Sequence, residues 1–243
     1  MNLRFVTISV MTFAAVLLCA GCRDVPGRPG PDTERPEQLL TFSALYQQNC
    51  AACHGENGKN GAAISLANPV YLAVAGVGNI ERITANGVAG TLMPAFAKSQ
   101  GGMLTDQQIA VLAQGVETAW GRADALGGVM PPAYASSGIG DPAQGQTAFV
   151  TFCASCHGAD GGGVARGKMR TGSIVDPAYL ALISDQGLRS LIVAGQPEEG
   201  MPDWRSDSVG AGSRVMTDKE VTDVVAWLAS HRSAAPGQVY VHP

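Results

Sequence analysis

The chain has 243 residues, and its 16 lysine and arginine residues against 20 aspartate and glutamate residues give a formal net charge of −4 at pH 7. This acidic balance argues against nucleic acid as a partner. After position 21, no apolar run reaches the roughly 18 residues that a membrane-spanning helix needs.

The first 21 residues have the pattern of an export signal. Arg4 supplies a positive start, residues 5–20 are apolar, and a small-small-cysteine end closes at Cys22. The segment resembles a bacterial lipoprotein signal, although Cys19 stands where that family usually has leucine. The resemblance implies lipid attachment at Cys22, which would anchor the exported protein to a membrane of the bacterial cell envelope, on the periplasmic side. An ordinary signal peptide and an uncleaved anchor helix are the alternatives.

A flexible tether is expected at residues 22–37. Residues 23–37 hold four prolines, two glycines and seven charged residues, and such a composition cannot bury a core. Residues 121–140 are rich in proline, glycine and serine, which is typical of a linker. The folded domains are therefore expected at 38–120 and 141–235, with a short tail at 236–243.

Each of these two domains carries the pattern Cys-x-x-Cys-His, which is the attachment signature of c-type haem. Cysteines at i and i+3 lie on one face of a helical turn, so both thiols can reach one porphyrin, and the next histidine can become the proximal iron ligand. Disulfides, a redox Cys-x-x-Cys pair or a zinc site would leave the two histidines unexplained. Two covalently bound haem c groups are predicted, with the binding residues Cys50, Cys53, His54, Cys153, Cys156 and His157.

The two domains are repeats of one another, since residues 69–96 align without a gap with the residues 108 positions later. In the first repeat, helices are expected near 38–53, 69–75, 79–86 and 105–119. Thr105 with Gln108, and Thr217 with Glu220, have the spacing of a capping box at the start of the last helix of each repeat. No strong strand period is seen, so an all-α fold with two tandem domains is predicted.

The second axial iron ligand is predicted to be methionine in both domains. Only one of the four histidines lies in residues 1–150, so the first haem cannot have two histidine ligands from its own domain. Methionine suits haem iron and raises its reduction potential. The alignment places Met93 and Met201 in equivalent positions, each before a proline. The predicted iron ligands are therefore His54, Met93, His157 and Met201, and the weaker candidates are Met103, Met169, Met216, His231 and His242.

The order of these features resembles a class I cytochrome c domain, with an N-terminal helix, Cys-x-x-Cys-His, a middle helical region, a Met-Pro loop and a C-terminal helix. Two such domains in tandem resemble cytochrome c4 and other dihaem carrier cytochromes. One departure is visible, because that family commonly has a Gly-Pro-Leu segment soon after the motif, where a backbone carbonyl orients the proximal imidazole. Neither repeat has this proline, so the acceptor for His54 and His157 is not assigned by sequence.

The resemblance implies electron transfer rather than enzyme catalysis. The expected partners are redox proteins, such as a membrane-bound donor or a terminal oxidase, and no small-molecule substrate is expected. The chain would act either as a tethered carrier or as the cytochrome subunit of a larger complex. The alternative function is a dihaem peroxidase, which requires one open iron. Tyr71 and Tyr179 are expected in the haem pocket walls, whereas Arg82 and Arg189 are expected at the solvated surface, with haem propionates as their alternative partners.

Overall fold

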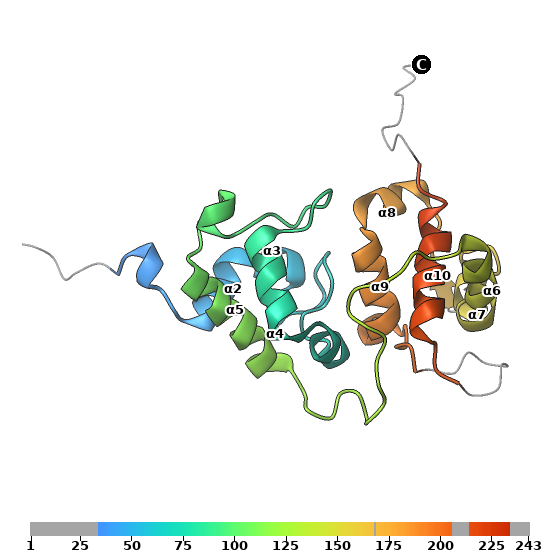
Figure 1. The fold of residues 1–243 in the computed structure, drawn as a ribbon, viewed down its shortest axis with the longest axis horizontal. Helices are drawn as coiled ribbons and strands as arrows, with labels where there is room; N and C mark the ends of the chain where they lie inside the picture. Colours follow the sequence, from blue (N-terminus) through green and yellow to red (C-terminus); the bar gives the residue numbers. More distant parts are fainter. Residues whose placement is uncertain (1–33, 168, 206–213, 234–243) are drawn as a thin grey trace, which may run out of the picture. The chain divides into compact units, whose positions relative to one another are not determined.

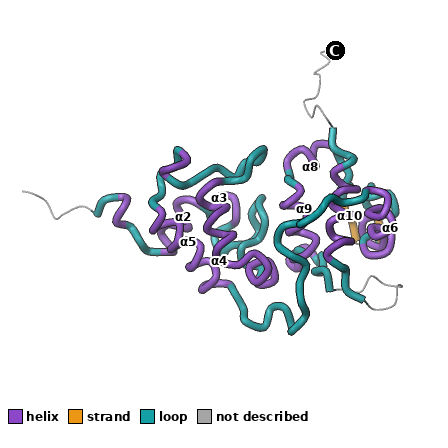
Figure 2. The backbone as a smooth tube through the Cα atoms, viewed as in Figure 1, coloured by secondary structure: helices purple, strands orange, loops and turns teal. Residues whose placement is uncertain are grey.

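The structure is a computed structural model, and it describes residues 34–167, 169–205 and 214–233. Figure 2 shows that these residues form helices joined by loops, together with one short pair of strands. The predicted all-α class with two tandem domains is therefore confirmed, and the strand pair is a small addition. The predicted signal at 1–21, the lipid site Cys22 and the tail at 236–243 lie outside the described residues.

The first repeat contains α2 (Phe42–Asn49), α3 (Ala51–His54), α4 (Pro69–Asn86), the 3-10 turn η2 (Lys98–Gln100) and α5 (Asp106–Trp120). The helix expected near 38–53 starts only at Phe42, because Thr41 before it has an extended backbone with ψ 116°. The Leu39 carbonyl oxygen accepts a hydrogen bond from Gln108 Nε2 at 3.0 Å instead. The helix is also interrupted at Cys50, whose φ of −119° separates α2 from α3. A further 3-10 turn, η1 (Pro36–Gln38), belongs to a separate unit of the chain.

The middle helical region of the first repeat is close to its prediction. The helices expected at 69–75 and 79–86 are both within α4, and Gly76 divides them with a non-helical backbone of φ 68° and ψ 157°. A positive φ of this kind is easily adopted only by glycine. The expected helix at 105–119 is α5, and its Thr105–Gln108 capping box is present.

The second repeat contains α6 (Pro142–Phe152), α7 (Ala154–His157), β1 (Val164–Arg166), β2 (Met169–Thr171), α8 (Pro177–Leu182), α9 (Asp185–Ala194), the 3-10 turn η3 (Pro197–Glu199) and α10 (Asp218–Ala229). The two strands pair antiparallel, with Val164 opposite Thr171. They fall in a loop that is longer here, since Pro177 follows His157 by 20 positions and Pro69 follows His54 by 15. The predicted capping box of Thr217 and Glu220 is also present.

In each repeat the first helix and the last helix pack against each other, as α2 does with α5 and α6 with α10 (Figure 1). A glycine lies at each contact. A Cβ at Gly115 of α5 would come within 2.1 Å of the Phe42 ring, and a Cβ at Gly145 of α6 would come within 2.0 Å of the Asp223 carbonyl oxygen. In the second repeat the ring of Trp227 packs on Phe149 at a centroid distance of 4.3 Å.

The linker is held against the second repeat by a buried arginine. Arg189 of α9 is only 2% exposed, so the expectation of a solvated Arg189 is wrong. Its Nε donates to the carbonyl oxygen of Ala133 at 2.9 Å, its Nη1 donates to Thr222 Oγ1 at 3.0 Å, and its Nη2 pairs with Asp218. The burial is tolerated because the guanidinium has partners on three sides.

Candidate functional site

The first Cys-x-x-Cys-His motif forms one tight helical turn after α2. Cys50 caps α3, and its carbonyl oxygen accepts from the backbone N–H groups of Cys53 at 3.2 Å and His54 at 2.9 Å. Cys50 is half-buried and Cys53 is exposed, and both are free thiols. The turn places the two sulfur atoms and the imidazole within one short segment, which is the arrangement that attachment of a single porphyrin requires.

The second motif forms the same turn, in which the Cys153 carbonyl oxygen accepts from Cys156 at 3.1 Å and from His157 at 2.9 Å. Its two cysteines are also free thiols. Burial, followed by the neighbouring thiol, raises the pKa of Cys50 to about 11 and that of Cys153 to about 12. Redox-active cysteines have a lowered pKa instead, so both pairs differ electrostatically from a dithiol redox site.

His54 has the hydrogen bond that sequence reasoning left unassigned. Its Nδ1 lies 2.8 Å from the carbonyl oxygen of Ile64, and a carbonyl can only accept. The proton is therefore on Nδ1, and Nε2 keeps the free lone pair that an iron ligand needs. The side chain is 8% exposed, and burial lowers the pKa of His54, against a smaller opposite effect of the bond to Ile64. The neutral imidazole is thus the stable form.

His157 differs from His54 in the hydrogen bonding of its Nδ1 atom. Burial lowers the pKa of His157 too, but its buried Nδ1 has no hydrogen-bond partner within the described residues. Two nearby backbone atoms are used otherwise: the His157 carbonyl oxygen accepts from Gly163 N at 2.8 Å, and the Cys156 carbonyl oxygen accepts from Thr171 Oγ1. The hairpin therefore supports the motif through its backbone and leaves the imidazole less constrained.

Met93 and Met201 lie on equivalent loops, which fold back onto the ends of α4 and α9. The Met93 carbonyl oxygen accepts from Val88 N at 3.0 Å. Met201 pairs with Gln196 through two backbone hydrogen bonds of 2.8 and 3.0 Å. Each loop leaves its helix through a glycine at positive φ, 68° at Gly87 and 67° at Gly195. Both methionine side chains are half-buried.

The weaker candidate ligands have other surroundings. Met103 is 80% exposed, and Met216 is 6% exposed within the core. His231 Nδ1 lies 2.8 Å from the Trp227 carbonyl oxygen, and its ring packs against the indole of that residue. The side chain of Met169 and all of His242 lie outside the described residues.

The second repeat also has an unpartnered donor close to its methionine loop. Trp204 is 2% exposed, and its indole Nε1 has no partner within the described residues. An unpaired buried N–H costs about 1–3 kcal/mol, so this group is suited to an acceptor that a cofactor would supply, such as a haem propionate. Free thiol pairs, neutral histidines and thioethers complete a donor set that fits haem c.

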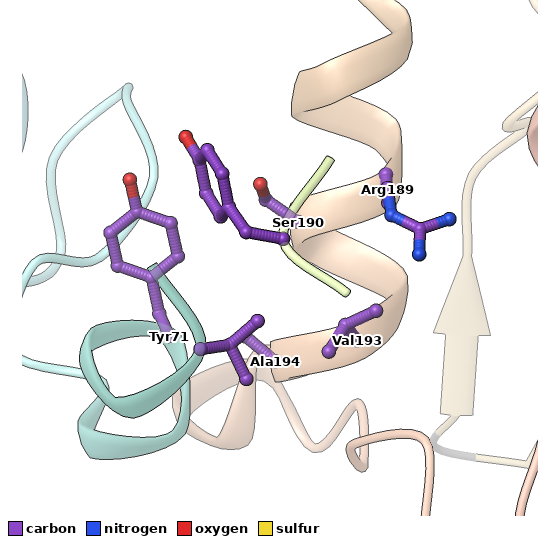
Figure 3. A pocket seen from close by; sticks show the side chains of 7 residues that line it. Tyr71, Arg189, Ser190, Val193 and Ala194 are labelled. Atoms are coloured by element: carbon purple, nitrogen blue, oxygen red, sulfur yellow. The ribbon is translucent and has the colours of Figure 1, made fainter. Parts of the chain in front are cut away.

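Tyr71 lies at the contact between the repeats. It is buried, and it lines a small cavity together with Tyr134 of the linker. Burial, followed by the Tyr134 hydroxyl, raises the pKa of Tyr71. Figure 3 shows it in a pocket that Ser190 and Ala194 of α9 also line. Tyr71 is therefore buried beside the linker and α9, whereas its counterpart Tyr179 is 36% exposed.

Two family models match the chain. The model described as "Cytochrome c" matches residues 142–232, and the model described as "Cytochrome C oxidase, cbb3-type, subunit III" matches residues 37–114. The curated protein "Cbb3-type cytochrome c oxidase subunit CcoP" of Azospirillum sp. (strain B510) is 29% identical over 143 residues. That alignment covers 52% of this chain and 43% of the relative, so it spans less than half of the relative's own length.

Proposed function

The chain is a dihaem c-type cytochrome with one covalently bound haem c in each of two cytochrome c domains, and we propose that it transfers electrons between redox proteins at a bacterial membrane. Bound haem supplies one-electron exchange at its iron. The side chains attach and orient that group. The observation that carries the proposal is the pair of matching sites, each with two cysteines that form no disulfide, a histidine and a methionine loop.

We propose that the axial ligands are His54 with Met93 and His157 with Met201. The bond from His54 Nδ1 to the Ile64 carbonyl oxygen supports this, because it presents Nε2 as the ligand atom. The equivalent folding of the two methionine loops onto α4 and α9 supports the second half of the proposal. Histidine and methionine together favour a high reduction potential, which suits a carrier that delivers electrons to an oxidase.

The axial assignment is tested by replacing Met93 and Met201 with alanine, one at a time, in the full-length holoprotein. Each change should remove about half of the weak far-red band that iron–thioether ligation gives, and should lower the potential of one haem. Met103→Ala is the control, because Met103 is 80% exposed. An unchanged band in Met201→Ala would overturn the assignment for the second haem.

An electron carrier and a peroxidase differ in whether a small molecule such as peroxide can bind the iron. If both axial positions are filled, carbon monoxide should bind neither reduced haem rapidly, and peroxide should not be turned over above a free-haem control. Electron exchange with a small soluble redox protein should be fast. A haem that binds carbon monoxide in the native protein and turns over peroxide would establish the enzyme instead.

We propose that the protein works within or beside a terminal oxidase. The support is the match of the first repeat to the model for cbb3-type oxidase subunit III, together with the similarity to a subunit named CcoP. Co-purification from a membrane extract provides the test. We expect an oxidase to co-purify with the cytochrome. If the oxidase also co-purifies with a chain that lacks both haem-binding repeats, the association is not specific.

We propose that a lipid on Cys22 tethers the protein. Its support is the small-small-cysteine end of the signal segment. Within the described residues, no helix is long and apolar enough to cross a membrane. Cys22→Ser should abolish labelling by radioactive fatty acid and block processing at that position. A chain that takes up no label before mutation would contradict the lipid anchor.

A further inference from the structure

Asn68 connects the first repeat to the second with a single buried side chain. Its Oδ1 accepts from the backbone N–H groups of Val70 at 2.9 Å and Tyr71 at 3.2 Å, and so caps the start of α4. Its Nδ2 donates to the carbonyl oxygens of Ala194 at 3.0 Å and Gly195 at 3.2 Å, at the end of α9. The side chain is 3% exposed, so water does not compete for these hydrogen bonds.

The carbonyl oxygens that Asn68 reaches belong to the segment from which the Met201 loop starts. The last carbonyl groups of a helix have no partner within the helix, and here the amide of Asn68 supplies one. Gly195 packs so closely on the loop that a Cβ there would lie 2.6 Å from the Pro202 backbone. The next residue, Gln196, pairs with Met201 through both backbone hydrogen bonds. Asn68 therefore fixes the base of that loop.

The same position in the second repeat does not have this role. Asp176 aligns with Asn68 and caps α8 through the backbone N–H groups of Ala178 at 2.9 Å and Tyr179 at 3.0 Å. Its side chain is exposed, and a carboxylate has no N–H to donate. The Met93 loop is instead held from within, since Thr91 Oγ1 donates to the Val88 carbonyl oxygen at 2.9 Å and accepts from Met93 N at 3.2 Å.

A second contact joins the first repeat to the Met201 loop. Ser65 Oγ lies 3.4 Å from Glu198 Oε1, in the turn η3 that precedes Met201. Ser65 directly follows Ile64, whose carbonyl oxygen holds His54. One short segment of the first repeat, residues 64–68, therefore contacts the proximal histidine of its own site and the methionine loop of the other site.

We propose that Asn68 is a positioning residue for Met201, so that the first repeat controls the axial ligation of the second haem. This inference rests on the proposed axial role of Met201. Without the amide donor, the carbonyl oxygens of Ala194 and Gly195 lose their partner, and the loop that presents Met201 is released from α4. The Met93 loop has its own support from Thr91, so no matching role is proposed for Asp176.

The test uses Asn68→Asp in the full-length holoprotein with Met93→Ala as the background. Aspartate keeps the Oδ1 that caps α4. It replaces the Nδ2 donor by an oxygen and adds a buried negative charge beside the carbonyl oxygens of Ala194 and Gly195. In this background the remaining far-red band reports Met201 alone, and imidazole is titrated until the band disappears. The loss of one or two hydrogen bonds, together with the carboxylate placed against two carbonyl oxygens, should lower the imidazole concentration at half displacement by at least about fivefold. The potential of the second haem should fall as well.

Asp176→Asn in the same background is the matched control and should leave both readouts unchanged. A shift of less than twofold for Asn68→Asp would overturn the proposal. If Asn68→Asp loses helical circular dichroism in the same proportion as it weakens the ligation by Met201, the proposal is overturned too. The residue would then be a general structural support. If the Met93→Ala, Met201→Ala double variant keeps the far-red band, the axial assignment itself is wrong, which is a different outcome from a failure of Asn68 alone.

Discussion

In both repeats the first and last helices cross closely, but the glycine at the crossing lies on the last helix in the first repeat and on the first helix in the second. At the crossing of their first and last helices, the first repeat has Phe42 on α2 and Gly115 on α5. In the alignment these positions correspond to Gly145 on α6 and Trp227 on α10. The large residue and the glycine have therefore exchanged helices. Gly115 faces the ring of Phe42, whereas Gly145 faces the Asp223 carbonyl oxygen and the Cβ of Trp227.

This exchange shows which property the fold preserves. Protein interiors are filled to nearly constant density, so the volume shared by two facing positions matters more than the identity of either residue. The aromatic neighbours follow the same rule. Trp120 packs on Tyr46 in the first repeat at 5.1 Å, and Trp227 packs on the aligned Phe149 at 4.3 Å, although the two tryptophans occupy different positions in their helices.

The largest effect is expected from alanine at the two crossing glycines. Gly145→Ala should destabilise the second repeat by about 3 kcal/mol, because the new Cβ would lie 2.0 Å from a backbone oxygen that cannot move without shifting α10. Gly115→Ala should cost about 1 kcal/mol, because its Cβ meets the movable ring of Phe42. Chemical denaturation of the holoprotein, followed by circular dichroism, measures both.

Phe42→Leu separates the two cases further. It should restore most of the stability lost in Gly115→Ala, since the smaller side chain makes room for the added methyl group. No side-chain substitution facing Gly145 should have that effect, because the clash there is with the Asp223 carbonyl oxygen. If Gly145→Ala and Gly115→Ala lower the free energy of unfolding equally, then a clash with backbone is no more costly here than a clash with a side chain, and the prediction is wrong.

A second difference lies at the aligned positions Glu81 and Arg189. Glu81 is exposed in α4, whereas Arg189 is buried in α9 and binds Ala133, Thr222 and Asp218. Arg189→Met should destabilise the second repeat by about 2 kcal/mol, because buried partners lose their donor while Asp218 stays partly solvated. Glu81→Gln is the control and should change stability by less than about 0.5 kcal/mol. Thermal denaturation of both variants checks this, and equal melting temperatures would contradict it.

Several parts of this arrangement could be predicted from the sequence because they depend on local pattern. The two Cys-x-x-Cys-His turns, the Thr105 and Thr217 capping boxes and the break of α4 into two parts all follow from residues close together in the chain. The axial roles of Met93 and Met201 stay predictions.

Other parts could not be predicted because they depend on distant segments or on backbone atoms. The acceptor for His54 is the carbonyl oxygen of Ile64, and a backbone atom has no residue type that would identify it. Arg189 is buried because a linker residue 56 positions earlier in the chain accepts from it. The hairpin has strands of three residues each, which are too short to show an alternating pattern.

The histidines of the two Cys-x-x-Cys-His motifs, His54 and His157, are a third difference between the repeats. A hydrogen bond from Nδ1 to a carbonyl oxygen raises the electron-donating power of Nε2. His54 has this bond and His157 Nδ1 has no partner among the described residues, so the first haem should have the lower reduction potential when all else is equal. A potentiometric titration of the wild type gives the two potentials, and the single methionine variants assign them to the repeats. A first haem with the higher potential would show that another influence outweighs this bond.

The smallest effect is expected at the caps of the last helices, where the first repeat has Gln108 and the second has Glu220. The hydrogen bond from Arg214, followed by those from Thr217, lowers the pKa of Glu220 to about 2 despite partial burial. A carboxyl whose folded pKa is depressed stabilises the protein above its unfolded pKa of about 4.5, and this contribution is lost as the pH falls toward 2. The amide of Gln108 does not titrate in this range.

Acid should therefore weaken the second repeat through this cap and leave the cap of the first repeat unaffected. Glu220→Gln should lower stability slightly at pH 7 and should flatten the dependence of stability on pH between about 2 and 4.5, the range set by the folded and unfolded pKa of Glu220. The contribution stays small because Glu220 and Arg214 are partly exposed and solvent screens their attraction. The measurement is the denaturation midpoint of wild type and variant at a series of pH values in that range. Parallel pH profiles for the wild type and Glu220→Gln would show that Arg214 does not hold this carboxylate in solution.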